Sequence, residues 1–204
     1  MPRRKMEKVF KRLAFPIVLA LAFAPNALAS GGDYVFEGGT HAQQVQVTSA
    51  LNASTFNWSL VPGTVVIHIA RGASSHAAPG AIWLDAGLLD SGRFAWGVVQ
   101  HEYAHQVDFA LLTDPMRARL HGLLHGASWW GGEGHAELDC ERFADALAWA
   151  YWPSHDNVMK PLSAADEGGQ VAPAVFRAAM VGLLQHGSAR VTASVSVKRH
   201  PRKG

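Results

Sequence analysis

The sequence is poor in cysteine, since Cys140 is the single one among 204 residues. An internal disulfide needs two cysteines, so the chain is not one of the small secreted domains that disulfides hold together. A chain of this length can bury a hydrophobic core of its own and suits one domain. We therefore expect stability to come from that core and from a bound metal ion. Cys140 itself is expected to be a buried small residue.

Long hydrophobic runs are scarce. The apolar run at residues 13–24 is interrupted by Pro16 and is shorter than the roughly 20 residues that a membrane-spanning helix needs. Six basic residues precede this run, and Ala27-Leu-Ala29 follows it. This order is typical of a secretory signal peptide. We expect cleavage after Ala29, which would leave a secreted or periplasmic protein without a membrane span; an uncleaved anchor is the alternative.

Net charge is also low, at +2 for the whole chain. Residues 1–29 hold six basic residues and one acidic residue, so the remainder carries 12 basic and 15 acidic residues, a net charge of −3. The basic character therefore belongs to the expected signal peptide and to the last few residues of the chain. We expect no nucleic-acid partner.

Histidine and glutamate carry the strongest signal. Residues His101-Glu-Tyr-Ala-His105 form the pattern H-E-x-x-H inside a segment, about 92–112, with helical periodicity. Residues four apart share a helix face, so both imidazoles can bind one metal ion. Glu102 lies about 100° around the helix, beside water at that metal. The pattern predicts Zn²⁺ bound by His101 and His105, with Glu102 as the general base of a hydrolase.

A third ligand is expected, because catalytic zinc sites usually have three protein ligands and one open position. A second helix predicted at about 135–150 contains Glu141 and Asp145, which are four residues apart. We expect Glu141 to be the third ligand and Asp145 to accept a hydrogen bond from a ligand histidine. Glu137 is the alternative ligand, although it has no aspartate four residues later.

Both motifs resemble those of the gluzincin metallopeptidases, the group that includes the thermolysin and neprilysin families. Those families pair H-E-x-x-H with E-x-x-x-D on the following active-site helix, and neprilysin-like members also have an acidic residue at the position of Asp108. The resemblance covers about residues 64–150. It implies a zincin-like α+β fold, in which a small twisted sheet precedes the active-site helix and a mostly helical C-terminal half. It also implies a peptide or protein substrate, which could pair with Gly80–Asp85 as a sheet edge facing the cleft.

Other elements follow from periodicity and turn residues. We expect a domain at 30–187, containing the helices above and further helices at about 114–126 and 173–187. A strand or disordered basic tail is expected at 188–204. Short β-like runs occur at 34–36, 45–48, 64–70, 80–85 and 191–197.

Several further residues have possible roles that spacing does not decide. His121 and His125 share a helix face, and we expect them to be surface or cleft residues rather than a second metal site. Trp129 and Trp130 could anchor a loop or form the wall of a substrate subsite. The residue that stabilises the oxyanion is left open among Tyr103, Tyr151, His155 and His186.

The sequence thus favours a secreted zinc-dependent metallopeptidase. The alternative is a non-catalytic, exported zinc-binding or interaction module, suggested by the mere 59 residues that follow Asp145. A third interpretation, an ordinary helix surface without metal, has to explain both halves of the motif as coincidence.

Overall fold

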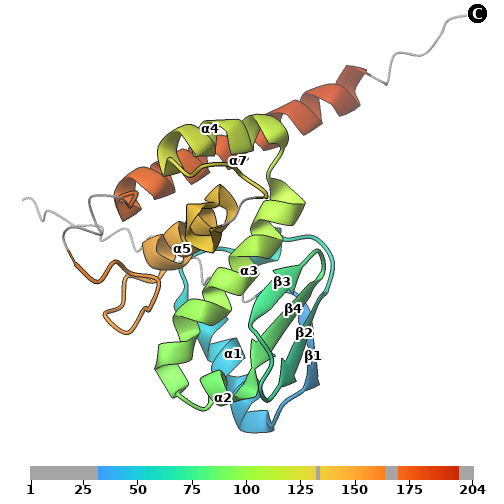
Figure 1. Cartoon of the computed structure of the whole chain (residues 1–204). Helices are drawn as coiled ribbons and strands as arrows, with labels where there is room; N and C mark the ends of the chain where they lie inside the picture. Colours follow the sequence, from blue (N-terminus) through green and yellow to red (C-terminus); the bar gives the residue numbers. More distant parts are fainter. Residues whose placement is uncertain (1–31, 132–133, 164–169, 198–204) are drawn as a thin grey trace, which may run out of the picture.

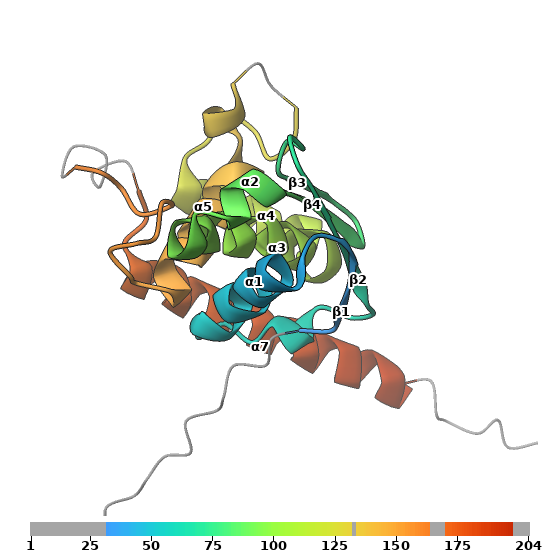
Figure 2. The ribbon, with the colours of Figure 1, turned by 90° about the horizontal axis from the view of Figure 1, so that it is seen from below.

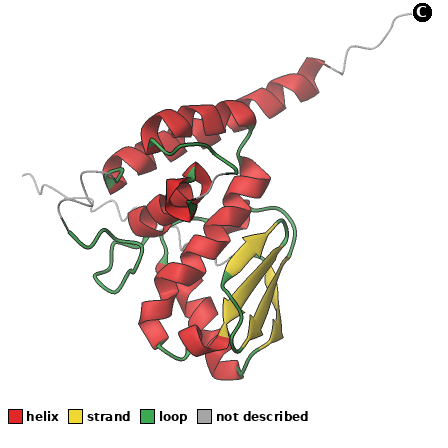
Figure 3. Ribbon diagram, in the orientation of Figure 1, coloured by secondary structure: helices red, strands yellow, loops and turns green. Residues whose placement is uncertain are grey.

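The computed structural model describes residues 32–131, 134–163 and 170–197. A small mixed sheet lies at one side, and helices make up the rest of the described chain (Figure 3). This arrangement confirms the predicted mixture of helices and a small sheet. The predicted signal peptide, residues 1–29, lies outside the described residues, as do residues 198–204 of the predicted tail.

The sheet contains four strands in the order β1-β2-β4-β3. Strands β1 (Tyr34–Gly38), β2 (Val65–Ala70) and β4 (Ala81–Asp85) are parallel, whereas β3 (His76–Ala78) is antiparallel to β4. The expectation that Gly80–Asp85 forms the sheet edge is therefore wrong. β3 covers that side of β4, and its three residues are too few to give an alternating pattern in the sequence.

Helices cover one face of the sheet. Alternate residues of the two central strands point toward these helices and are buried, namely Val65, Ile67, Ile69, Ile82 and Leu84. Helix α1 (His41–Ala53) and helix α3 (Trp96–Leu111) lie side by side on this face (Figure 2). The sheet therefore supports the helix that carries the H-E-x-x-H motif.

Helix α1 corrects the prediction of a β-like run at 45–48. Thr40 caps the helix and forms a reciprocal capping box with Gln43. Its buried residues, Gln43, Val47, Ala50 and Leu51, follow helical spacing. Tertiary burial of this face outweighs the β propensity of the valines. The 3₁₀ turn η1 (Trp58–Leu60) then leads toward β2.

Two short helical segments connect β4 to the next long helix. Helix α2 (Ala86–Leu89) and the 3₁₀ turn η2 (Gly92–Ala95) precede α3, so the predicted helix at 92–112 begins as a tighter turn. Helix α4 (Asp114–Leu124) follows, with Pro115 in its first turn. It matches the helix predicted at about 114–126.

The C-terminal half is helical. The 3₁₀ turn η3 (His135–Glu137) precedes α5 (Asp139–Tyr151), which packs along α3 on the side away from the sheet (Figure 1). Helix α7 runs over Pro173–Val197, so the prediction of a strand at 191–197 is wrong, and the helix continues beyond 187. Among the described helices, none has the length and hydropathy needed to span a bilayer.

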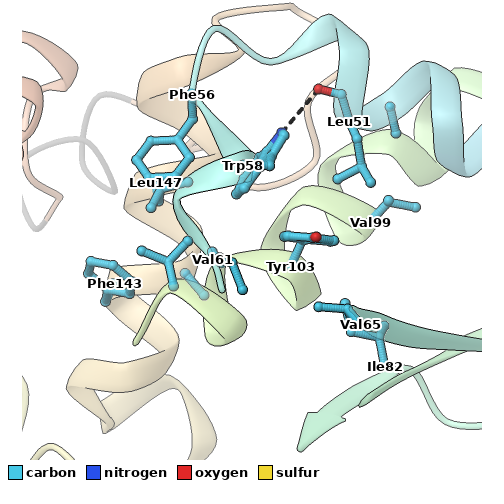
Figure 4. Packing of buried hydrophobic residues seen from close by; sticks show 14 of the residues in the cluster. Leu51, Phe56, Trp58, Val61, Val65, Ile82, Val99, Tyr103, Phe143 and Leu147 are labelled. Carbon is cyan, nitrogen blue, oxygen red and sulfur yellow. Dashed lines mark hydrogen bonds between the residues drawn. The ribbon is translucent and has the colours of Figure 1, made fainter. Parts of the chain in front are cut away.

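A single hydrophobic cluster joins these layers. Trp58 and Tyr103 are fully buried between α1, α3 and α5, and their rings meet edge to face at 5.2 Å (Figure 4). The Trp58 indole donates to the carbonyl of Leu51 at 3.0 Å. Phe143 and Leu147 bring α5 into the same cluster. This packing fixes α5 against α3, and with it the two motifs of the candidate site.

Candidate metal centre

Three side-chain atoms converge between α3 and α5. Nε2 of His101 lies 3.2 Å from Nε2 of His105, and Oε2 of Glu141 lies 3.1 Å from the first nitrogen and 3.4 Å from the second. All three side chains are largely buried. The structure therefore brings together the three residues predicted as ligands, although α3 and α5 are separated in sequence by α4 and the 127–138 loop.

This triangle has the size that a metal ion requires. Zinc binds histidine nitrogen and carboxylate oxygen at roughly 2.0 to 2.2 Å, so ligand atoms at tetrahedral angles lie about 3.4 Å apart. The three observed separations fall close to that spacing. Two imidazoles and one carboxylate are also a common donor set of catalytic zinc sites. The donors present therefore fit a zinc ion.

Two other carboxylates bear on the choice of ligands. Glu102 also offers an oxygen that lies within 4.8 Å of the ligand atoms of both histidines. We favour Glu141 as the third ligand because its oxygen is within 3.4 Å of each imidazole nitrogen. Glu137 lies in η3, before α5, and its side chain is exposed.

Asp145 supports the site from one turn further along α5. Nδ1 of His101 donates to Oδ1 of Asp145 at 2.7 Å. Because a carboxylate can only accept, this bond places a hydrogen on Nδ1 and leaves the lone pair of a neutral ring on Nε2. The nitrogen that faces His105 and Glu141 is then free to bind a metal ion.

The metal-free site carries opposite charges in close contact. Burial acts to lower the pKa of His101, but hydrogen bonds to Asp145 and Glu141 outweigh it and raise the pKa to about 10. Burial acts to raise the pKa of Glu141, but hydrogen bonds to His101 and His105 lower it well below its usual range. Without metal, therefore, a protonated imidazole takes part in an ion pair with a carboxylate.

Glu102 is a further buried carboxylate at the site. It is 6% exposed and lines the same cleft as the three candidate ligands. Burial raises its pKa above the usual value, while the charges of His101 and His105 partly oppose that rise. A raised pKa makes the carboxylate a better proton acceptor at neutral pH.

The site opens into a cleft of about 150 Å³. One part of its wall comes from the edge strand and the residue before it, Ser75, His76 and Ala77, and another part comes from Phe109 and Trp130. The floor contains the candidate ligands and Glu102. A short strand edge and several polar side chains therefore line the same cleft as the candidate ligands.

The aromatic wall begins at a candidate ligand. The ring of Phe109 lies 6.1 Å from that of His105, and the ring of Trp130 lies 5.8 Å from that of Phe109, with interplanar angles of 22° and 16°. Trp130 is 49% exposed, whereas Trp129 packs against Phe143 and anchors the loop. Trp129 thus has the predicted anchoring role, and Trp130 lines the cleft.

Asp108 connects this loop to α3. Its side chain is fully buried, accepting from Arg117 of α4 at 2.9 Å and from the Trp129 indole at 3.0 Å. The Arg117 guanidinium also lies over the ring of Trp130, at 5.6 Å. Burial raises the pKa of Asp108, although both hydrogen bonds oppose the rise. Asp108 is therefore a structural anchor of the aromatic wall.

His76 is one of the cleft residues that the sequence did not indicate, as are Ser75, Ala77 and Phe109. Its Nδ1 donates to the carbonyl of Ser74 at 2.8 Å, and its ring stacks on Trp83 at 4.7 Å. Trp83 in turn stacks on His68, which pairs with Glu37 at 3.0 Å. The residues around His76 have no strand periodicity, so nothing in the sequence marks them as an edge strand.

Of the four residues considered for oxyanion stabilisation, the three whose side chains the structure describes, Tyr103, Tyr151 and His155, do not line this cleft. Tyr103 and Tyr151 contact the hydrophobic cluster, and His155 is exposed beside Asp156. The side chain of His186 lies outside the described residues. Spacing along the chain could not decide this, because the direction of each side chain depends on helix packing.

Two other predicted features are structural. His121 pairs with the buried carboxylate of Asp139, at the start of α5, and Asp139 also accepts from the Gly126 amide at 2.7 Å. No second group of metal-binding side chains occurs among the described residues. Cys140 is buried, as expected, and its thiol donates to Oε1 of Glu141 at 3.7 Å.

Comparisons with protein-family models, curated proteins and solved structures found no match. Among the described residues, a mixed α+β fold carries a buried cluster of His101, Glu102 and His105 that could hold a metal ion.

Proposed function

We propose that the protein is a zinc-dependent hydrolase of peptide bonds, with His101, His105 and Glu141 as the zinc ligands. The observation that carries this proposal is the triangle of their three ligand atoms, with sides of 3.1 to 3.4 Å, at the floor of an open cleft. A structural zinc site is closed, whereas a catalytic one keeps a position for water. The resemblance of both motifs to the gluzincins, and through them to a zincin-like fold, supports the same proposal.

In the proposed hydrolysis, the cleft residues hold the metal and transfer one proton. Zinc, when bound, would polarise a water molecule and the carbonyl of the scissile bond. Glu102 takes a proton from the water as its oxygen attacks the carbonyl carbon. Glu102 then delivers that proton to the nitrogen as the carbon–nitrogen bond breaks. Asp145 holds the His101 ring in place throughout.

A peptide or protein is the substrate class that the cleft fits. Strand β3 lies at the sheet edge and pairs with β4 on one side. A peptide that adds to its other side would receive backbone hydrogen bonds and lie across the candidate ligands. The basic and apolar segments before residue 30 support the further proposal that this reaction takes place outside the cytoplasm.

Metal analysis and hydrolysis together test the proposed function. We expect purified protein to bind about one equivalent of zinc and to degrade casein, and a chelator to abolish that activity until zinc is restored. Glu102→Gln should retain the zinc and lose about 100-fold or more of the activity. Glu137→Gln is the matched control and should retain both.

The outcomes of these measurements distinguish the proposed function from its alternatives. Zinc binding without turnover by the wild-type protein would support the alternative, a non-catalytic zinc-binding or interaction module. Full activity in Glu102→Gln would contradict the role of Glu102. Less than about half an equivalent of zinc under saturating conditions would contradict the metal site itself.

A further inference from the structure

Gln106 connects the active-site helix to the edge of the sheet. It follows His105 on α3 and is 2% exposed. Its Nε2 donates to the carbonyls of Ala78 at 2.8 Å and Ala81 at 3.1 Å, and its Oε1 accepts from the Gly80 amide at 2.8 Å. The side-chain amide thus uses both of its hydrogens and its oxygen on one short segment of backbone.

That segment is the turn between β3 and β4. Strand β3 has three residues, and they pair with β4 at three positions only. So short a strand is weakly held by its ladder alone. Gln106 adds three side-chain hydrogen bonds from the helix that carries His101, Glu102 and His105, and so joins both sides of the cleft directly.

We infer that Gln106 positions the edge strand for peptide binding, by fixing the distance between β3 and the metal-binding helix. This inference rests on the proposed function and assigns to Gln106 a positioning role, since the side chain touches neither substrate nor metal. The substrate class it implies is an extended peptide long enough to pair with β3. A peptide too short to reach β3 does not use this alignment.

Substitution of Gln106 should change KM and leave kcat nearly unchanged. Loss of the Gln106 bonds displaces β3, whose contacts hold the peptide, but leaves the ligands and Glu102 in place on α3 and α5. An interaction that holds substrate and transition state equally affects KM and not kcat. Gln106→Met, which keeps the length of the side chain without its polar groups, should therefore raise KM for long peptides.

Gln100 provides the matched control. It lies on the same helix, is fully buried, and donates through Nε2 to a backbone carbonyl, that of Ala50 on α1, at 2.8 Å. Gln100→Met removes a buried amide that makes one hydrogen bond, with its Oε1 unpaired among the described residues, from α3 without touching the edge strand. Any general loss of stability should therefore appear in both variants, whereas a change in peptide binding should appear in Gln106→Met alone.

The experiment uses zinc-loaded full-length protein and peptides derived from casein. Mass spectrometry of a casein digest identifies a cleaved bond, and peptides of eight and three residues are made around it. For Gln106→Met we expect KM for the longer peptide to rise about tenfold, with kcat and the KM of the shorter peptide changed less than about twofold. Zinc content should equal that of the wild type, and Gln100→Met should show no such difference between the peptides.

Equal effects of the two substitutions, or equal effects on both peptides, would overturn this inference and leave the proposed function intact. Absence of hydrolysis by the zinc-loaded wild-type protein would instead overturn the proposed function, and this inference with it. Should Gln106→Met fail to fold, Gln106→Asn, which withdraws the amide by one methylene group, takes its place. The same length-dependent rise in KM is expected there, and its absence counts against Gln106.

Discussion

Asp145 and His101 are joined by a hydrogen bond of 2.7 Å, although 44 residues separate them in the sequence. The bond connects α5 to α3 and holds the Nδ1 hydrogen of the imidazole on the side away from the cleft. It therefore directs the other nitrogen of His101 toward His105 and Glu141. Asp145 thus gives the candidate metal centre one fixed orientation of its first histidine.

Removing this bond should weaken metal binding. We expect Asp145→Ala to raise the zinc dissociation constant about 10- to 100-fold, because the His101 ring loses the partner that orients it. Competition with a chromophoric chelator measures the change. Asp114→Ala, which alters an exposed carboxylate on α4, serves as the control and should leave the constant unchanged. An unchanged constant in Asp145→Ala would show that the bond has no part in metal binding.

The identity of the third ligand can be tested with two isosteric substitutions. Glu141→Gln should weaken zinc binding by about 100-fold or more, because a neutral amide replaces one of three charged or basic donors. Glu137→Gln should have no effect, since that side chain is exposed and lies before α5. Zinc titration of both variants measures the difference. The reverse result would make Glu137 the ligand.

Zinc binding should release a proton. The pKa of His101 is raised from 6.5 to about 10 in the metal-free site, so the ring is protonated at pH 7 to 9, and zinc requires it neutral. Apparent affinity should rise about tenfold per pH unit over that range and level off above pH 10. Calorimetry in buffers of different ionisation enthalpy measures the proton release. A pH-independent affinity would show that His101 is already neutral.

The same shift affects the stability of the metal-free protein. A raised pKa in the folded state means that the His101 ion pairs contribute fully below about pH 6.5 and that this contribution is lost as pH rises through about 10. We expect the free energy of unfolding of chelator-treated protein, measured by urea denaturation at a series of pH values, to fall across that window. The fall should be smaller in His101→Gln, which has no proton to lose.

Asp108 should be important for stability rather than for proton transfer. Asp108→Asn removes the charge that Arg117 faces and weakens the bond to Trp129, so we expect a loss of about 2 to 3 kcal/mol. Asp114 pairs with the same arginine but is 98% exposed, and Asp114→Asn should cost less than about 0.5 kcal/mol. Urea denaturation measures both. Equal losses of unfolding free energy in the two variants would show that the burial of Asp108 does not strengthen its interactions.

The two neighbouring tryptophans should respond differently. Trp130→Ala should lower kcat/KM for peptides with little change in stability, since Trp130 is half exposed and lines the cleft. Trp129→Ala should lower the free energy of unfolding by about 3 kcal/mol, since Trp129 packs on Phe143 and donates to Asp108. Peptide hydrolysis and urea denaturation, measured on both variants, separate the roles. A stability loss in Trp130→Ala equal to that of Trp129→Ala would refute this division.

Local chemistry makes part of this structure predictable from the sequence. Residues four apart on a helix share a face whatever the fold, so spacing alone pairs His101 with His105, and Glu141 with Asp145. The strands at 65–70 and 81–85 are likewise marked by apolar runs between turns, and the first of these runs is rich in β-branched side chains. The helix from Asp114 is marked by its aspartate and proline.

Tertiary structure decides what periodicity cannot. Residues 45–48 and 191–197 have β-like composition, yet both are helical. In α1, burial of one helix face overrides the propensity of a few residues. Strand β3 is too short to leave a pattern, and it exists because β4 pairs with it and Gln106 holds the turn between them. The position of His76 in the cleft therefore follows from the placement of β3 and from no local signal.

The sequence by itself determined which candidate ligands share a helix face, because residue type and helical spacing are local properties of the chain. Only the tertiary structure decided that the carboxylate of Glu141 meets the two imidazoles, and that His76 of β3 and Trp130 line the same cleft. Those relationships depend on how α5 packs on α3 and how α3 packs on the sheet. Such packing is settled by the whole hydrophobic cluster, and no short motif contains it.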